Sequence, residues 1–253
     1  MIKQNLDLKQ LLDLSDKALK NKDYVTAKKI LERVILINKN IPEVYNNLGI
    51  ICLNSKNSKD AINYFDQAIK LNPKFSMAYC NLGLAYNKMS QLEKAAENYL
   101  KAIESDQKNI VAYFNIGNLF KFKEDLDQAE KNFNKAINLN PNMIMAYINL
   151  FEIFDKSNQL KKLENILNKA KQKFGDHPLV NFCIGIYEYK KKNYTEVIKI
   201  YEKIVLDKND IGRLTVRNEL LAKSYDHIGN YDKAYEAFQS ANNQINSFFQ
   251  NKY

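Results

Sequence analysis

The chain has 253 residues, and its hydrophobic content of 45% is ordinary for a folded protein, which argues against a disordered chain. No stretch approaches the roughly 18 uninterrupted apolar residues of a membrane-spanning helix, and charged residues between Lys3 and Asp13 interrupt any run of the signal-peptide type. The three cysteines, Cys52, Cys80 and Cys183, lie far apart in the sequence, so we expect free thiols and a cytoplasmic protein without a membrane partner.

The net charge of +9 comes almost wholly from lysine, since Arg33, Arg213 and Arg217 are the only arginines. Lysine without arginine is weak support for nucleic-acid binding, because bidentate readout of bases favours the planar guanidinium group. We therefore expect no nucleic-acid partner. Two explanations of the charge stay open, namely an amino-acid bias imposed by an AT-rich genome and an acidic binding partner.

A spaced template of apolar and small residues recurs along the chain with a period of 34 residues. The copy that begins at Pro42 carries Tyr45, Leu48, Gly49, Ala61, Phe65, Ala68 and Pro73. The copies that begin at Ser76 and Ile110 repeat most of these residue types at the same positions. A fixed period of this size is typical of stacked units, each too small to bury its own apolar face.

Each copy predicts two helices, here called helix A and helix B, of about a dozen residues with a short polar turn between them. In the second copy, helix A is predicted over Pro42–Asn54 and helix B over Ser58–Leu71. The copies begin near residues 8, 42, 76, 110, 144, 178 and 215, the last being delayed by an insertion near residues 208–212. The tail, about residues 243–253, is predicted to form a capping helix.

Small residues predict close packing of helix A on helix B. We number the positions of each copy as slots, starting from its first residue. Slot 8 holds glycine in several copies, including Gly49 and Gly83, and slot 20 holds alanine, as at Ala61. Leucine in place of Gly83 would overpack this contact, at about 1–3 kcal/mol. The fifth copy has Phe151 and Leu163 at these two slots, which predicts looser or differently angled packing there.

These positions resemble the tetratricopeptide repeat family over residues 8–242, most strongly in the second to fourth copies. The resemblance implies an all-α fold, an α-α superhelix (TPR solenoid), with residues 1–253 as a single domain of about seven helix-turn-helix repeats. It also implies that the A helices build the inner wall of a groove, with slots 2, 5, 6, 9, 12 and 13 facing a ligand.

Slot 6 carries asparagine in four successive copies, at Asn47, Asn81, Asn115 and Asn149. A carboxamide both donates and accepts hydrogen bonds, so a ladder with one asparagine per repeat can hold the backbone of an extended peptide. Some tetratricopeptide proteins, including the O-linked N-acetylglucosamine transferase, are similar in having such a ladder. The alternative is that each asparagine bonds a neighbouring helix.

Three neighbouring groove residues add to the predicted peptide-binding site. Phe114 would supply an apolar contact, and Lys88 and Lys121 would attract acidic side chains or a terminal carboxylate. The alternative for the lysines is a solvated face. We therefore hypothesise a scaffold that binds a protein or an extended, acidic peptide in its concave groove, and we leave self-association into a homo-oligomer open.

No grouping typical of catalysis or of metal binding occurs in the sequence, so we expect no enzyme activity, no metal and no cofactor. His177 and His227 are isolated and are predicted to be turn or surface residues. A competing hypothesis starts from Leu221–Asn242, which resembles the end of the repeat arm in bacterial tetratricopeptide–sulfotransferase fusions. In that case the chain would recruit substrate for a catalytic domain that is absent from it.

Overall fold

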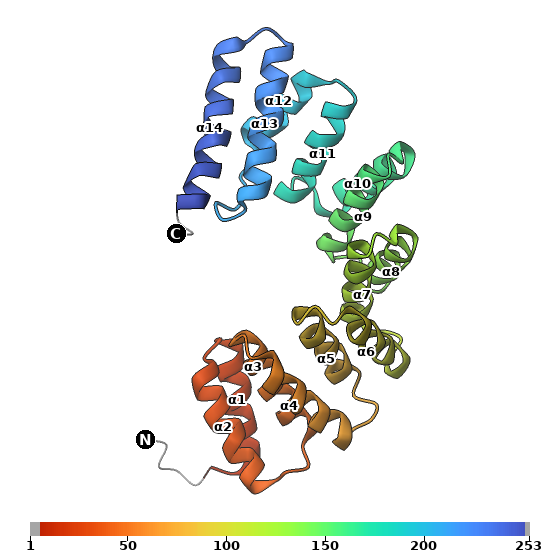
Figure 1. Cartoon of the computed structure of the whole chain (residues 1–253), viewed down its shortest axis with the longest axis vertical. Coiled ribbons are helices and arrows are strands. Elements are labelled where there is room, and N and C mark those ends of the chain that lie inside the picture. The colour runs from red at the N-terminus through yellow and green to blue at the C-terminus, as the bar shows by residue number, and fades with distance from the viewer. Residues whose placement is uncertain (1–5, 251–253) are drawn as a thin grey trace. The chain divides into compact units, whose positions relative to one another are not determined.

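The computed structural model describes residues 6–250, apart from the side chains at 244, 245 and 247–250. Every regular element among these residues is an α-helix (Figure 1). The helices are α1 (Leu8–Lys20), α2 (Tyr24–Ile37), α3 (Pro42–Asn54), α4 (Ser58–Leu71), α5 (Ser76–Lys88), α6 (Leu92–Ser105), α7 (Ile110–Phe122), α8 (Leu126–Leu139), α9 (Ile144–Lys156), α10 (Leu160–Phe174), α11 (Pro178–Lys190), α12 (Tyr194–Lys203), α13 (Ile211–His227) and α14 (Tyr231–Gln250). The all-α fold of stacked helical hairpins is thereby confirmed.

The chain divides into two compact units, Met1–Leu139 and Asn140–Tyr253, which we call unit 1 and unit 2. Unit 1 contains α1 to α8, and unit 2 contains α9 to α14. The odd-numbered helices are the A helices of the repeats and the even-numbered ones are the B helices. The prediction of a single domain over residues 1–253 stays a prediction, and each unit is described by itself.

Local sequence signals set the ends of the helices. Asp7 and Gln10 form a capping box at the start of α1, in which Asp7 Oδ1 accepts from the backbone N–H of Gln10 at 2.8 Å. Pro42 begins α3 and Pro178 begins α11, positions where the missing N–H of proline costs no helical hydrogen bond. In six repeats the turn between helices A and B contains a non-glycine residue with positive φ, as at Lys56, which gives these hairpins the same turn conformation.

In the hairpins that carry glycine at slot 8, a ring of helix B lies against that glycine of helix A. A Cβ atom added to Gly83 would lie 2.7 Å from ring carbons of Tyr99 and 3.1 Å from the carbonyl oxygen of Ala95. At Gly185 the nearest ring carbon of Tyr201 would be 2.1 Å away. The glycine at slot 8 therefore makes room mainly for the aromatic ring at slot 24, and the backbone of the slot 20 alanine also comes close.

The fifth repeat solves the same packing problem with other side chains. Phe151 occupies the glycine slot and is 3% exposed, and Leu163 at slot 20 is fully buried. Slot 24 holds Leu167 in place of an aromatic residue, so the large ring has moved from helix B to helix A. In keeping with the prediction from these larger residues, α9 and α10 make less close backbone contact than α3 and α4 do.

The last repeat differs from the sequence prediction at both of its ends. Helix α13 begins at Ile211 and not near residue 215, because the Asp210 carboxylate caps the helix by accepting from the backbone N–H of Arg213 at 3.1 Å. Helix α14 continues without a break to Gln250, so no separate capping helix begins near residue 243. The part of the predicted capping helix at residues 251–253 lies outside the described residues.

Among residues 6–250, no helix combines the length and the apolar character that crossing a membrane requires.

Gly185→Ala tests the glycine–ring contact. Tyr201 is fully buried and its hydroxyl donates to the carbonyl oxygen of Phe182 at 2.9 Å, so the ring has little freedom to move away from a new methyl group. We expect the free energy of unfolding to fall by about 1–3 kcal/mol, as measured by urea denaturation.

The matched control is Gly212→Ala, also on a helix of unit 2. The nearest atom to its new Cβ would be Asp210 Oδ1 at 4.0 Å, so we expect unchanged stability or a gain of about 0.4–1 kcal/mol. Equal destabilisation by the two substitutions would contradict the role given to the ring contact.

Candidate peptide-binding faces of the A helices

The predicted asparagines of unit 1 lie on three successive A helices and form hydrogen bonds between repeats. Asn47, Asn81 and Asn115 are half-buried on α3, α5 and α7. Asn81 Nδ2 donates to Oδ1 of Asn46 at 2.9 Å, and Asn115 Nδ2 donates to Sγ of Cys80 at 3.7 Å. In both cases the slot 6 carboxamide of one repeat donates to the slot 5 side chain of the preceding repeat.

The sequence left open whether each asparagine binds a ligand or bonds a neighbouring helix. Asn81 and Asn115 do bond a neighbouring helix. Each contact uses one of the two N–H groups of the carboxamide. The second N–H and the carbonyl oxygen of each carboxamide take no part in this hydrogen bond. The bond also restricts the rotation of the side chain. A group held in this way loses less entropy on binding a ligand, so the contacts are compatible with the predicted ladder, which stays a prediction.

Asn149 differs from the other three asparagines. It lies on α9 in unit 2, is 6% exposed and interacts with another group of the protein. Little of its carboxamide is therefore accessible to a ligand.

The three other predicted site residues lie near the ladder helices in different environments. Phe114 on α7 is half-buried, and its ring centroid lies 5.7 Å from that of Phe133 on α8, so part of this side chain belongs to the hairpin core. Lys88, the last residue of α5, is exposed. Lys121, near the end of α7, is half-buried and already interacts with another group of the protein.

Cys80 is buried beneath the carboxamides of unit 1. Burial raises the pKa of its thiol from the ordinary value of 9.0 to about 11, and the hydrogen bond from Asn115 opposes this rise. The thiol therefore keeps its proton at neutral pH and accepts a hydrogen bond at a site that is only 1% exposed. Its reactivity toward solvent reagents is correspondingly low.

Some polar residues that position the A helices were not found from the sequence. Asn109 caps α7 by accepting from the N–H of Ala112 at 2.9 Å, and its Nδ2 donates to Ser76 Oγ at 2.7 Å. Ser76 Oγ in turn donates to the carbonyl oxygen of Ala102 at 2.6 Å. This buried chain of bonds ties the starts of α5 and α7 to the end of α6. The cap could have been found from the sequence, because Asn109 directly precedes Ile110 and asparagine is a favoured N-cap residue.

In unit 2 the A helices α9, α11 and α13 line an open pocket of about 410 Å³. Its apolar lining consists of Ile148, Phe151, Phe182, Cys183, Ile186 and Val216. Its polar lining consists of Glu152, Asp155, Asp210 and Arg213. The guanidinium of Arg213 forms an ion pair with Asp210, and Lys190 Nζ lies 2.7 Å from Oδ1 of Asp155.

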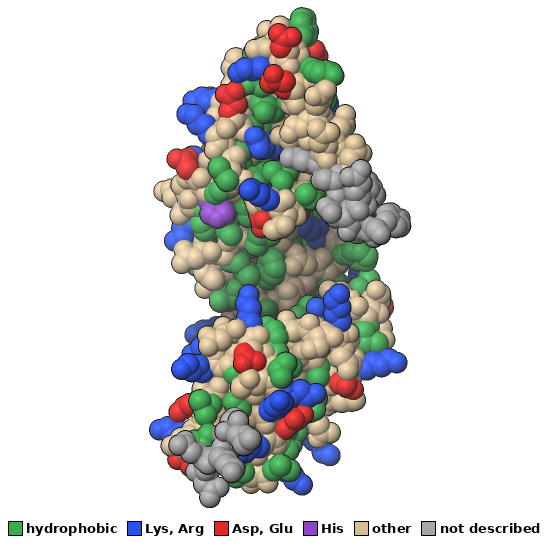
Figure 2. Space-filling view, turned by 90° about the vertical axis from the view of Figure 1, so that its left-hand side faces the viewer, with side chains coloured by type: hydrophobic (Ala, Val, Ile, Leu, Met, Phe, Trp, Pro, Cys, Tyr) green, Lys and Arg blue, Asp and Glu red, His purple; other side chains and the backbone are tan. Residues whose placement is uncertain are grey.

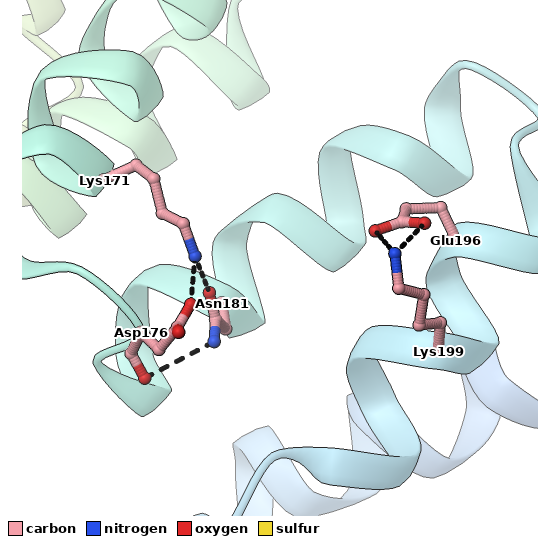
Figure 3. Close-up of polar contacts among 5 residues, drawn as sticks. All are labelled: Lys171, Asp176, Asn181, Glu196 and Lys199. Atoms are coloured by element: carbon pink, nitrogen blue, oxygen red, sulfur yellow. Dashed lines mark hydrogen bonds and ion pairs between the residues drawn. The ribbon is translucent and has the colours of Figure 1, made fainter.

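A larger pocket of about 600 Å³ in unit 2 lies among α10, α11 and α12. Figure 3 shows its polar contacts: Lys171 points toward Asp176 and Asn181, and Lys199 lies 3.1 Å from Glu196 on the same helix. These two lysines are thus already paired with acids of the pocket itself. The arrangement leaves them little net charge with which to select a ligand.

The surface charges are mixed. On the face drawn in Figure 2, lysine and arginine side chains are interspersed with aspartate and glutamate and with apolar side chains. Among the residues that the structure describes, no group of three or more histidine, cysteine or acidic side chains is placed to hold a metal ion.

The two histidines have local structural contacts. His177 caps α11, its Nδ1 accepting from the N–H of Leu179 at 3.2 Å. His227 ends α13, and its ring centroid lies 4.2 Å from that of Tyr194, edge to face. These positions at helix ends agree with the prediction of turn or surface residues.

Comparison with known proteins supports the repeat assignment. The tetratricopeptide repeat model matches residues 42–75, 76–109 and 110–143. These three consecutive units are tetratricopeptide repeats, as their slot residues predict. No curated protein matches the sequence.

Several solved structures share the fold. PilF of Pseudomonas aeruginosa matches with a TM-score of 0.66 and 18% identity, over 78% of this chain and 88% of that one. The C-terminal part of a TPR repeat-containing protein from Cytophaga hutchinsonii matches with a TM-score of 0.68 and 17% identity, over 90% and 93%. A chain of the APC/C hetero-tetramer Cut9–Hcn1 matches with a TM-score of 0.61 and 15% identity, over 93% of this chain but only 46% of that one. At these identities the likeness shows the fold alone.

The buried thiol of Cys80 predicts a loss of stability in alkali. The unfolded thiol loses its proton near pH 9.0 and the folded one near 11, so between these values the unfolded state binds fewer protons and the free energy of unfolding falls as the pH rises. For this group the loss is on the order of 2 kcal/mol.

The measurement is urea denaturation of wild type and Cys80→Ala at about pH 8 and about pH 11. We expect the decline between the two pH values to be smaller in the variant, whatever the variant's stability at the lower pH. Burial also raises the pKa of Tyr99, and the charge of the Cys80 thiolate adds to this rise, so a part of the difference between the two declines comes from Tyr99. Identical declines would show that Cys80 titrates normally.

Proposed function

We propose that this chain is a non-catalytic scaffold that binds a protein or an extended peptide along its A-helix faces, and that the slot 6 asparagines of unit 1 hold the peptide backbone. Tetratricopeptide repeats support a role in protein interaction. The observation that supports the finer proposal is the inter-repeat hydrogen bonding of Asn81 and Asn115, which fixes two carboxamides on successive A helices with unused donor and acceptor capacity.

The spacing of the repeats suits an extended chain. Packed helices lie about 8–10 Å apart, and an extended peptide advances about 3.3 Å per residue. One carboxamide per A helix therefore meets about every third residue of a peptide that runs across the helices. Because the bonded groups are peptide units, this contact is largely independent of the peptide sequence.

Charge favours an acidic partner on unit 1. Lys88 is exposed at the end of α5, and no acidic partner for it is seen within the described structure. Lys121 would contribute only by exchanging its present partner for the ligand. A handful of such contacts supports micromolar binding, about −8 kcal/mol. The Cut9–Hcn1 hetero-tetramer, a structural neighbour, illustrates this fold in a complex between two proteins.

The double variant Asn81→Ala/Asn115→Ala tests the proposal. Peptides of about twelve residues would be selected from a display library against the wild-type chain, and their affinities measured by fluorescence anisotropy. Since each lost carboxamide removes backbone hydrogen bonds of about 1 kcal/mol, we expect all selected peptides to bind at least about tenfold more weakly, whatever their sequences.

The matched control is Asn132→Ala. Asn132 is half-buried on α8, a B helix, and its Nδ2 donates within the helix to the carbonyl oxygen of Gln128 at 2.7 Å. We expect this variant to bind like wild type. Unchanged affinity of the double variant, with its thermal unfolding still cooperative, would refute the backbone-holding role of the asparagines.

The repeat-arm hypothesis for residues 221–242 and the homo-oligomer left open by the sequence both stay predictions. The first concerns a catalytic domain outside this sequence, and reading the encoding frame beyond Tyr253 would test it.

A further inference from the structure

The pocket of about 600 Å³ among α10, α11 and α12 lies at a slot that other repeats fill with a tyrosine. Slot 4 of helix A holds tyrosine in the second to fifth repeats, at Tyr45, Tyr79, Tyr113 and Tyr147. In the sixth repeat the same slot holds Asn181, which lines the pocket. The pocket therefore lies where the repeat template loses an aromatic ring.

Other repeats show how a ring is held at slot 4. Tyr147, also in unit 2, is 6% exposed, and its ring centroid lies 5.3 Å from that of Phe174 on α10, edge to face. Its hydroxyl donates to the carbonyl oxygen of Pro141 at 3.3 Å. In the fourth repeat, Nζ of Lys135 at slot 26 lies 5.8 Å from the ring centroid of Tyr113. A slot 4 ring is thus held by helix B of its own repeat and by the junction before that repeat.

Asn181 reproduces the polar contact of a slot 4 tyrosine without its ring. Its Nδ2 donates to the carbonyl oxygen of Asp176, in the junction before α11, at 3.4 Å (Figure 3). Its Oδ1 accepts from Nζ of Lys171 at 3.2 Å. These contacts hold a short carboxamide at the junction, and the volume that a ring would take up remains as part of the pocket.

Helix B of the sixth repeat leaves this space open because it ends early. Helix α12 has 10 residues, while α4, α6 and α8 have 14 residues each. The backbone is extended at Ile204, so a last helical turn like those of the other B helices is missing. Val205, the next residue, is 80% exposed and lines the pocket. A ligand can therefore reach the vacant slot from solvent.

The lining suits an aromatic side chain. Ile184 on α11 and Ile200 on α12 are half-buried and Ile204 is 7% exposed, so these residues give the pocket an aliphatic wall. Lys203 also lines the pocket, and it occupies slot 26, the slot from which Lys135 contacts a ring in the fourth repeat. No residue within the described part of the chain forms an ion pair with Lys203. Its ammonium is available for a cation–π contact.

We propose that this pocket receives a tyrosine or phenylalanine side chain of a partner protein, which takes the place of the missing slot 4 ring. The ring enters among the three isoleucines, with the ammonium of Lys203 over its face. The volume of about 600 Å³ falls within the usual range for ligand sites, about 300–1,000 Å³, and accommodates the ring together with the backbone that carries it. The site uses none of the slot 6 asparagines of unit 1, so the inference goes beyond the proposed backbone-holding function.

Blocked amino acids probe the pocket directly. The wild-type chain, labelled with ¹³C at isoleucine methyl groups, would be titrated with the N-acetyl amides of tyrosine, phenylalanine, leucine and serine. We expect the two aromatic amides to shift the methyl signals of Ile184, Ile200 and Ile204 with millimolar affinity. The leucine amide should bind at least about threefold more weakly, because it has no ring face for the cation. The serine amide should cause no shifts, because it buries little apolar surface.

Asn181→Tyr tests the slot by refilling it. The new side chain restores the residue type of the second to fifth repeats, so we expect unfolding to stay cooperative. Because the ring then takes up the site, the aromatic amides should bind at least about tenfold more weakly. The matched control is Asn181→Ala, which removes the carboxamide but leaves the space empty. It should bind the aromatic amides within about twofold of wild type.

Lys203→Gln tests the cation separately. It should weaken the aromatic amides about twofold to fivefold and leave the leucine amide unchanged, because only a ring gains from the cation. The control is Lys223→Gln, which changes an exposed lysine of α13 that does not line the pocket. This variant should bind all of the amides like wild type.

Four outcomes would overturn the proposal. Three of them are equal affinity of the tyrosine and leucine amides, absence of methyl shifts at the three isoleucines, and full binding of the aromatic amides by Asn181→Tyr. The fourth is loss of cooperative unfolding in Asn181→Tyr, because it would show that slot 4 of this repeat cannot hold a ring.

The result is separable from that of the asparagine test. The double variant Asn81→Ala/Asn115→Ala should bind the aromatic amides like wild type, whether or not it loses the selected peptides. Selective binding of aromatic amides by this variant would support the pocket even if the backbone-holding role of the asparagines were refuted.

Discussion

The close approach of a helix B side chain to the backbone of helix A is the constraint on which each regular hairpin depends. Phe65, Phe133 and Tyr201 are fully buried, and each lies where the slot 8 residue has no Cβ to displace it. The ring contributes roughly 2–3 kcal/mol of burial energy, but only if the helix backbone admits it. Because this contact takes up the inward face of helix A, the opposite slots remain available for contacts between repeats and with ligands.

The 410 Å³ pocket among α9, α11 and α13 lies where unit 2 departs from this template at two places. Exchange of glycine for Phe151 moves a large ring onto α9, where it becomes part of the pocket lining. The insertion before the last repeat is absorbed as an extra turn at the start of α13, and this turn supplies Asp210, Gly212 and Arg213 to the opposite wall. Irregularities that weaken the repeat pattern in the sequence thus coincide with the residues that give this face its own chemistry.

Much of the fold could be predicted because the 34-residue period agrees with the residues that mark helix starts and ends. The predicted bounds of α3 and α4 match the structure, since Pro42 marks a start and the apolar spacing continues to Asn54 and Leu71. The start of α13 was missed although Asp210 is a recognisable cap, because the fixed period took precedence over the local signal. The end of α14 was missed because no glycine or proline interrupts residues 231–250. The bond from Asn81 to Asn46 joins residues 35 apart and depends on how neighbouring A helices pack, which slot numbering alone does not give.

The proposed function separates affinity from selectivity. Under that proposal, carboxamides such as Asn81 would contact peptide units, which every partner possesses, and would raise affinity without distinguishing sequences. Discrimination between partners requires an element that also penalises the wrong partner, and backbone contacts alone do not provide one. A scaffold with such carboxamides alone would therefore bind extended chains with little regard to their sequence.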